Sequence, residues 1–301
     1  MTTRTPMRER FYSELGPLLD SDPRVAVVLA VIGSSGLTDV SARHPDRVID
    51  VGIREQTMVG VAGGLALAGL RPIVHTYAPF LVERGYEQLK LDLGHQDVGA
   101  LLVSTGASYD ASTAGRTHQA PADVALISAL PGWTVHVPGH AEELARMVRR
   151  ESATDQRVYV RMSSAQNARP HPVDGRLHVV RGGRHTLPLV VVVGPLLDTV
   201  LEATHDLAVR VAYTSTPHPL DAHGLRTLAG PTPVVAMVEP YLEGTSAAAV
   251  AAALVDRPSR VLHVGVPRDS ELRRYGSPKD HAAAHGLDAP GIRAQIKELV
   301  G

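Results

Sequence analysis

Short apolar runs alternate along the chain with longer stretches in which apolar residues recur at helical spacing. Residues 25–32 form one continuous apolar run, which is typical of a strand buried on both faces of a parallel sheet. Residues 7–20 show the second pattern, with Phe11, Leu15 and Leu18 on one side of a predicted helix. The alternation predicts strands and helices in turn from the start of the chain.

The same alternation continues to residue 162. We expect further strands at 48–51, 71–77, 100–104, 134–137 and 158–162, and further helices at 55–69, 81–92, 121–130 and 140–153. Strands separated by helices imply a parallel sheet with helices on both of its faces. In such a sheet the functional loops follow the carboxyl ends of the strands.

The stretch 163–188 breaks this pattern, because it is rich in proline, glycine and polar residues. We interpret it as a connection with one β excursion at 177–180. A second series follows, with strands at 189–194, 210–214, 234–239 and 260–266 and helices at 199–207, 244–255, 281–285 and 290–300. The predicted fold class is α/β, with two three-layer domains that each hold a mainly parallel sheet with helices on both faces. The predicted domains are 1–165 and 189–301, joined by a linker at 166–188.

Composition narrows the possible functions. The chain has 301 residues and a formal net charge of −1, which gives no indication of a nucleic acid or a membrane surface as a partner. It has no cysteine, so it forms neither a disulfide nor a thiolate metal site. We find no signal-peptide core and no stretch of roughly 18 apolar residues, and we expect a cytoplasmic protein. The fifteen histidines are scattered, so we predict no metal ligands in this chain.

The most informative stretch is 52–69, where an acidic residue stands between a short apolar strand and a helix of small residues. Gly60, Gly63 and Gly64 each lower helix propensity by roughly 1 kcal/mol relative to alanine. A chain accepts that cost where another helix or a flat ligand must approach its backbone closely. Glu55, at the start of this helix, is either a candidate acid/base group or a residue that favours the positive end of the helix dipole.

Four sequence blocks occur in order: GIREQ at 52–56, TYAPF at 76–80, RGYEQ at 84–88 and GRTHQ at 115–119. They resemble, in turn, the G-I-x-E-Q segment, the aromatic pair, the R-A-[FY]-D-Q segment and the G-x-T-H-Q segment of transketolases and 1-deoxyxylulose-5-phosphate synthases. The resemblance covers most of the chain and is weaker after residue 170. It implies the later half of a transketolase, with the pyrimidine-binding domain and the C-terminal domain, like the second subunit of a split transketolase.

The resemblance also implies roles for single residues. Glu55 would hydrogen-bond N1′ of the aminopyrimidine of thiamine diphosphate, and Tyr77 and Phe80 would stack on that ring. His118 would contact a substrate oxygen. From the residues alone, Tyr77 and Phe80 are equally compatible with core packing, and His118 with a surface position.

Two motifs of the family are missing. The family holds the diphosphate and a divalent metal through a separate domain with a G-D-G segment and a downstream asparagine, and we find neither here. The dipeptide at 174–175 lacks the preceding glycine. The resemblance therefore implies a separate diphosphate-binding subunit that supplies the ligands of Mg²⁺, a homodimer of this chain, and an α2β2 assembly.

Three departures from the family bear on the substrate. Val31 stands where transketolases have an aspartate, Thr113 and Ala114 replace an acidic pair, and Ser164 replaces a phosphate-binding arginine. A serine cannot replace the bidentate clamp of an arginine, so phosphorylated sugars should be poor substrates.

We therefore expect a small ketol or keto substrate and the transfer of a two-carbon ketol unit. The alternatives are chemistry like that of 1-deoxyxylulose-5-phosphate synthase or of the β subunit of a 2-oxoacid dehydrogenase, and a non-catalytic homologue that acts as a partner subunit.

Overall fold

Six parallel strands form the first sheet. The computed structural model describes residues 4–300. The strands are β1 (Val25–Leu29), β2 (Val48–Asp50), β3 (Arg71–Tyr77), β4 (Leu101–Thr105), β5 (Trp133–His136) and β6 (Arg157–Arg161). Their order is β2-β1-β3-β4-β6-β5, and every neighbouring pair is parallel, which confirms the predicted sheet.

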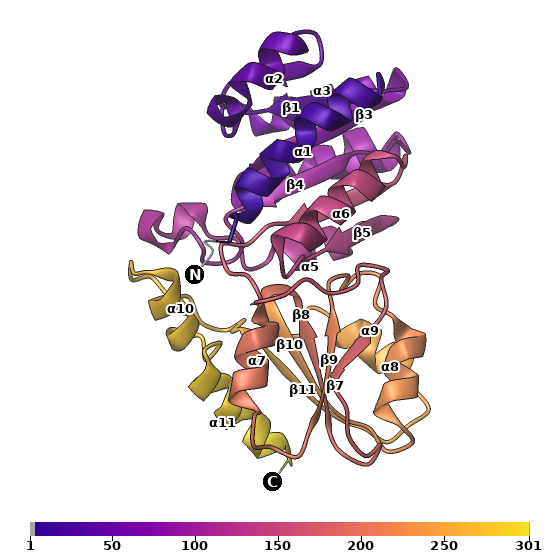
Figure 1. Cartoon of the computed structure of the whole chain (residues 1–301), viewed down its shortest axis with the longest axis vertical. Helices are drawn as coiled ribbons and strands as arrows, with labels where there is room; N and C mark the ends of the chain where they lie inside the picture. The colour runs from indigo at the N-terminus through magenta and orange to yellow at the C-terminus, as the bar shows by residue number, and fades with distance from the viewer. Residues whose placement is uncertain (1–3, 301) are drawn as a thin grey trace.

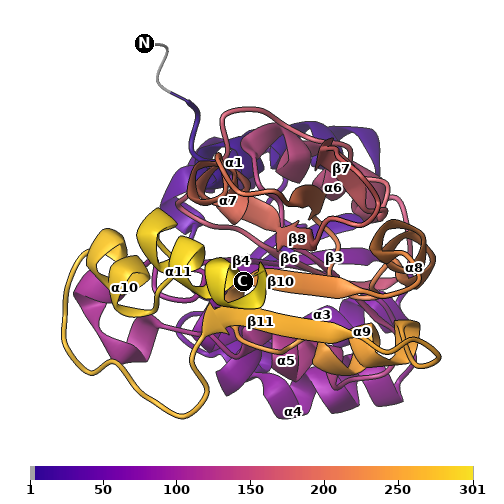
Figure 2. The same cartoon turned by 90° about the horizontal axis from the view of Figure 1, so that it is seen from below.

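Helices cover both faces of this sheet (Figures 1 and 2). The helices α1 (Met7–Ser21) and α6 (Ala141–Ser152) lie on one face, and α3 (Glu55–Leu67), α4 (Tyr86–Gln88) and α5 (Asp123–Ser128) lie on the other. A short helix, α2 (Thr38–Arg43), follows β1. The predicted helix at 81–92 is divided, because π-helical segments at Pro79–Arg84 and Leu89–His95 flank α4. Proline has no N–H to donate, and Gly85 and Gly94 weaken a regular helix here.

The small residues of α3 permit a close approach within this chain. A Cβ atom on Gly63 would lie only 2.7 Å from the carbonyl oxygen of Asp92, so α3 crosses the segment Leu89–His95 at a position that requires glycine. The predicted close approach is confirmed at Gly63. Gly64 instead faces open space, on the outer side of α3 where Leu67 is also exposed.

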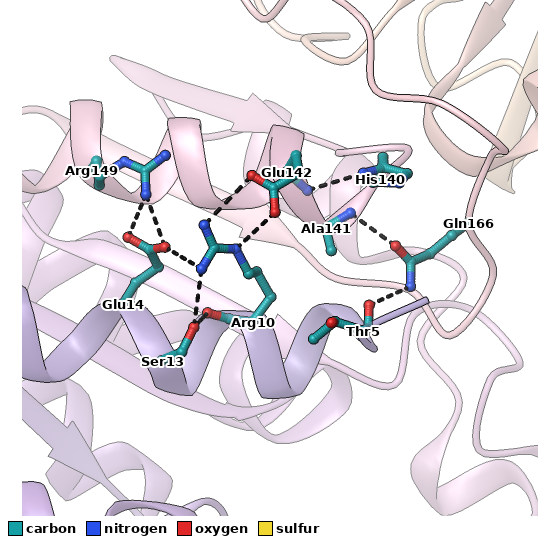
Figure 3. Close-up of polar contacts among 9 residues, drawn as sticks. All are labelled: Thr5, Arg10, Ser13, Glu14, His140, Ala141, Glu142, Arg149 and Gln166. Atoms are coloured by element: carbon teal, nitrogen blue, oxygen red, sulfur yellow. Dashed lines mark hydrogen bonds and ion pairs between the residues drawn. The ribbon is translucent and has the colours of Figure 1, made fainter. Parts of the chain in front are cut away.

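Charged side chains hold α1 against α6 (Figure 3). The Arg10 guanidinium lies 3.0 Å from Glu14 and 3.1 Å from Glu142, and Arg149 donates to both oxygens of Glu14 at 2.9 and 2.8 Å. Gln166 extends this contact. Its Nε2 donates a hydrogen bond to the carbonyl oxygen of Thr5, and its Oε1 accepts one from the amide of Ala141, the first residue of α6. These contacts fix the amino-terminal turn of α1, which borders the candidate site.

Five strands form the second sheet. They are β7 (His178–Arg181), β8 (Leu189–Val193), β9 (Arg210–Thr214), β10 (Val234–Leu242) and β11 (Arg260–Val266). The order is β11-β10-β8-β9-β7, and β7 alone is antiparallel to its neighbour. The expected β excursion thus pairs with β9 as an edge strand. The predicted α/β fold with two mainly parallel sheets is confirmed.

Helices also cover both faces of the second sheet (Figure 1). The helices α7 (Leu197–Ala203) and α11 (Ala289–Val300) pack on one face, and α8 (Ala222–Ala229) and α9 (Ala247–Ala253) on the other. A further helix, α10 (Pro278–Ala284), precedes α11. The sequence pattern did not predict α2 or α8, which are short helices of six and eight residues.

Residues 4–300 contain neither a candidate membrane span nor a candidate metal cluster. None of their helices combines the length and the apolarity that a membrane crossing requires. Nor do three or more histidine or acidic side chains gather there as potential ligands of one metal ion.

Candidate functional site

Glu55 is the first residue of α3, and its side chain is only 2% exposed. The turn before it is held by Asp50, whose Oδ1 accepts hydrogen bonds from the amides of Gly52 at 2.9 Å and Val31 at 3.0 Å. Gly52 adopts a φ of 73°, which suits glycine. The loops after β1 and β2 therefore fix the position at which this carboxylate enters the fold.

Val31 has an unusual backbone in one of these loops. Its φ is 67°, a left-handed value that is a true outlier for a β-branched residue, and its side chain is 45% exposed. Strain of this kind costs on the order of 1–3 kcal/mol and clusters at functional sites. The strained loop lies at the carboxyl end of β1, next to the turn that leads to Glu55.

Arg84 is the partner of the buried carboxylate. Its Nη1 donates to Oε2 of Glu55 at 2.6 Å, and its guanidinium carbon lies 4.3 Å from the centre of the Phe80 ring. No hydrogen bond from residues 4–300 engages Oε1 of Glu55, so this second carboxylate oxygen remains able to meet a ligand. The motif analysis singled out the RGYEQ block but did not assign Arg84 to the site.

Three rings gather beside this ion pair. The centre of the His118 ring lies 5.5 Å from that of Tyr77 and 5.1 Å from that of Phe80, and Tyr77 and Phe80 lie 6.1 Å apart, all edge to face. Gly106 makes room for this cluster, because a Cβ atom there would lie 2.4 Å from the Tyr77 ring. The structure thus brings together Glu55, Tyr77, Phe80 and His118, the four residues singled out in the sequence.

Tyr77 and His118 line a pocket of about 610 Å³, which we call the site pocket. Thr113, Ala114 and Ser164 also line it. Glu55 and Phe80 lie outside its lining. Three of the four substituted positions connected with the substrate are therefore on the wall of one pocket, and Val31 lies outside its lining.

Arg8 contributes a cation to this wall, and sequence reasoning missed it. Its Nε donates to the Tyr12 hydroxyl at 2.7 Å, and that hydroxyl lies 3.2 Å from Nε2 of His75. Burial lowers the pKa of His75 to about 4, and its Nδ1 lies 2.7 Å from the Val103 carbonyl oxygen. The imidazole is therefore neutral with its proton on Nδ1, so that Tyr12 donates to Nε2 and accepts from Arg8.

These residues fit one half of a thiamine-type cofactor. A buried carboxylate with one free oxygen can face a ring nitrogen, and an aromatic cluster beside it can hold a flat heterocycle. The other half is not matched, because residues 4–300 gather no ligand set for a metal that would bind a diphosphate.

Comparison with known proteins decides the family. Residues 4–169, more than half of the chain, match the family described as transketolase, pyrimidine binding domain. The chain belongs to this transketolase family. A protein of Rhodococcoides fascians named as an uncharacterized 33.6 kDa protein in fasciation locus is 48% identical over 300 residues, which cover 99% of this chain and 96% of that protein.

One further relative and two solved structures are also similar to this member of the transketolase family. The 1-deoxy-D-xylulose-5-phosphate synthase of Magnetococcus marinus is 30% identical over 308 residues, which cover 97% of this chain and 49% of the synthase. The chain thus spans about half the length of that relative. A solved structure described as a split gene transketolase, inactive beta4 tetramer, matches with a TM-score of 0.81 and 25% identity over 99% of both chains. The transketolase of Campylobacter jejuni matches in fold, with a TM-score of 0.76 and 16% identity over 97% of this chain and 46% of that one.

Proposed function

We propose that this chain is the pyrimidine-binding subunit of a thiamine diphosphate-dependent, transketolase-like enzyme that transfers a two-carbon ketol unit. The observation that carries the proposal is the buried Glu55, which has one carboxylate oxygen held by Arg84 and the other free of hydrogen bonds from residues 4–300, while Arg84 also packs on Phe80 of the aromatic cluster. The family match and the full-length likeness to a split gene transketolase support it.

Each residue has a distinct task in this proposal. When bound, thiamine diphosphate would supply a nucleophilic carbon that adds to carbonyl groups and a positively charged ring that accepts the electron pair left on the adduct. Glu55 holds the proton that it shares with N1′ of the aminopyrimidine, and Arg84 orients its carboxylate. Tyr77 and Phe80 hold the ring by stacking, and His118 binds a substrate oxygen in the site pocket.

A second subunit completes the site in this proposal. It supplies the diphosphate contacts and the ligands of Mg²⁺, and two copies of each chain form an α2β2 assembly around a homodimer of this one. The exposed apolar side chain of Ile53, two residues before Glu55, supports an interface there, since Ile53 is 74% exposed. We also propose that residues 1–165 and 189–301 are the two domains and that the enzyme is cytoplasmic.

Synthase-like chemistry is the second candidate, because relatives about 30% identical to this chain carry that name. The β-subunit chemistry of a 2-oxoacid dehydrogenase and a non-catalytic partner role are further alternatives. The buried acid with a free oxygen favours a catalytic role over a purely structural one.

The decisive experiment is reconstitution. This chain should co-purify with a subunit that carries the G-D-G segment and the downstream asparagine, and calorimetry on the complex should show thiamine diphosphate binding that depends on Mg²⁺. Ketol transfer by the complex and not by either subunit would support the proposal. A complex that binds no cofactor would identify the chain as a non-catalytic homologue.

A further inference from the structure

A single carboxylate lies on the wall of the site pocket at a position that the family resemblance does not explain. Asp110 follows β4 in the loop that leads to His118, and it lines the site pocket together with Ser163 and Ser164. The same three residues line a second cavity of about 620 Å³, which extends between this loop and the helices α7, α10 and α11. Asp110 thus belongs to the partition between two cavities.

The side chain of Asp110 is held by the segment that follows β6. Its Oδ2 accepts from the amide of Ser164 at 2.8 Å, and its Oδ1 accepts from the Ser164 hydroxyl at 2.9 Å and from the Ser163 hydroxyl at 3.4 Å. A carboxylate offers about four acceptor positions, so roughly one remains for a ligand. A rigidly held acceptor with one open position is suited to selecting among hydrogen-bond donors.

Asp110 has no ion-pair partner within the described part of the chain. The salt bridges formed by residues 4–300 do not include it. Arg161 is close enough to influence its charge but is committed elsewhere, since its Nε donates to Asp123 at 2.7 Å and its Nη2 to Ser108 at 2.6 Å. Burial raises the pKa of Asp110, and the hydrogen bonds from Ser164 oppose that shift.

We propose that Asp110 is the specificity-determining residue of the site pocket, and that it selects substrates which present a hydroxyl or ammonium group over those which present a phosphate there. A phosphate beside a half-buried carboxylate that has no ion-pair partner among residues 4–300 meets like-charge repulsion. A hydroxyl instead donates to the open acceptor position. The inference rests on the proposed function and names the substrate class of the same site.

An arginine at position 164 would not restore phosphate binding by itself if Asp110 has this role. The backbone amide of Ser164 lies 2.8 Å from Asp110, so an arginine there would first pair with that carboxylate. Ser164→Arg alone should therefore improve phosphate binding little. The guanidinium becomes available to a phosphate only when Asp110→Asn accompanies it.

The test uses two probes that differ only in the phosphate group, erythritol and erythritol 4-phosphate. Their dissociation constants are measured on the full chain by ligand-observed NMR, without cofactor or partner. We expect the wild type to prefer erythritol, and Asp110→Asn to shift the ratio of the two constants at least about tenfold toward the phosphate. Asp110→Asn with Ser164→Arg should shift it further.

Three controls separate the possible causes. Asp269→Asn removes an exposed carboxylate outside the site pocket and should leave the ratio unchanged. Arg8→Gln removes the guanidinium that lines the site pocket and is opposite in charge to Asp110. The difference between this variant and the wild type measures how much of the phosphate binding depends on Arg8. Asp110→Ser serves as the second variant if the asparagine variant does not fold.

An unchanged ratio in Asp110→Asn or Asp110→Ser would overturn the proposal. So would wild-type binding of erythritol 4-phosphate as tight as in the variant, or no erythritol binding by the wild type. These outcomes are distinct from failure of the proposed function, because the measurement requires neither Glu55 nor cofactor chemistry.

Discussion

Replacing Glu55 with glutamine tests the centre of the proposed site. The side chain is 2% exposed, and its contact with Arg84 is 2.6 Å long. Glutamine keeps an oxygen that accepts from Arg84 but cannot exchange a proton with N1′. General acid–base groups contribute about 10²–10⁴-fold to rates, which corresponds to about 3–5 kcal/mol of barrier. We therefore expect hydrogen–deuterium exchange at C2 of bound thiamine diphosphate to slow by that factor.

The fold should tolerate this change. The hydrogen bond from Arg84 loses its charged acceptor, which weakens it by about 1 kcal/mol. The Arg84 side chain is 39% exposed, so water continues to solvate its charge. The free energy of unfolding should therefore fall by no more than about 1 kcal/mol, and cofactor affinity should fall less than the exchange rate, because Tyr77 and Phe80 remain.

The assay is NMR of the C2 proton in the complex with the partner subunit. Glu87→Gln is the matched control, because it removes an exposed acid in the neighbouring segment and should leave exchange unchanged. Wild-type exchange in Glu55→Gln would refute the reasoning. Glu55 would then be a structural residue at the start of α3, and the catalytic interpretation would lose its main support.

Three further predictions follow from the same contacts. The isolated chain should bind thiamine diphosphate only weakly, and micromolar affinity in calorimetry without a partner would contradict the split arrangement. Ile53→Asp should weaken the association of this chain with its partner chains in sedimentation experiments. Val255→Asp is the control, because Val255 is 82% exposed but lies in the second half of the chain, and it should not weaken association. Equal effects of the two variants would count against an interface beside Glu55. Burial raises the pKa of Glu239 from 4.5 to about 7, so the folded state holds this proton more tightly than the unfolded state. The free energy of unfolding should therefore fall by about 3 kcal/mol as pH rises from 4.5 to about 7. In urea unfolding measured between pH 5 and 8, Glu239→Gln should remove this decline. If the variant shows the same dependence on pH as the wild type, another group is responsible.

Most strands of the two sheets were predictable because they are buried on both faces. Residues 25–29 and 189–193 are buried throughout, and their continuous apolar runs record that burial directly. The helix at 222–229 left a weaker signal, since it is short and only two of its residues are buried. The π-helical segments around α4 were not predictable, because their geometry depends on local packing that periodicity does not report.

The candidate site likewise contains residues that the sequence indicated and one that it did not. Tyr77, Phe80 and His118 were found because family-like blocks surround them, and parallel topology brings the loops that carry them to one edge of the sheet. Asp110 lies in the same region but carries no motif. Its partner Ser164 is 54 residues away, and only the fold shows that they meet.

The contact between α1 and α6 has a consequence for biosynthesis. Arg10 and Glu142 are 132 residues apart in the chain, and the apolar side of α1 shares one core with Leu144 of α6. A nascent chain therefore exposes this first helix's apolar side until most of the first sheet has left the ribosome. Contacts between such distant segments slow folding, and apolar surface that waits for its partner promotes aggregation. Fragments that end before α6 should accumulate as insoluble protein, because α1 is made long before the helix that helps to cover it.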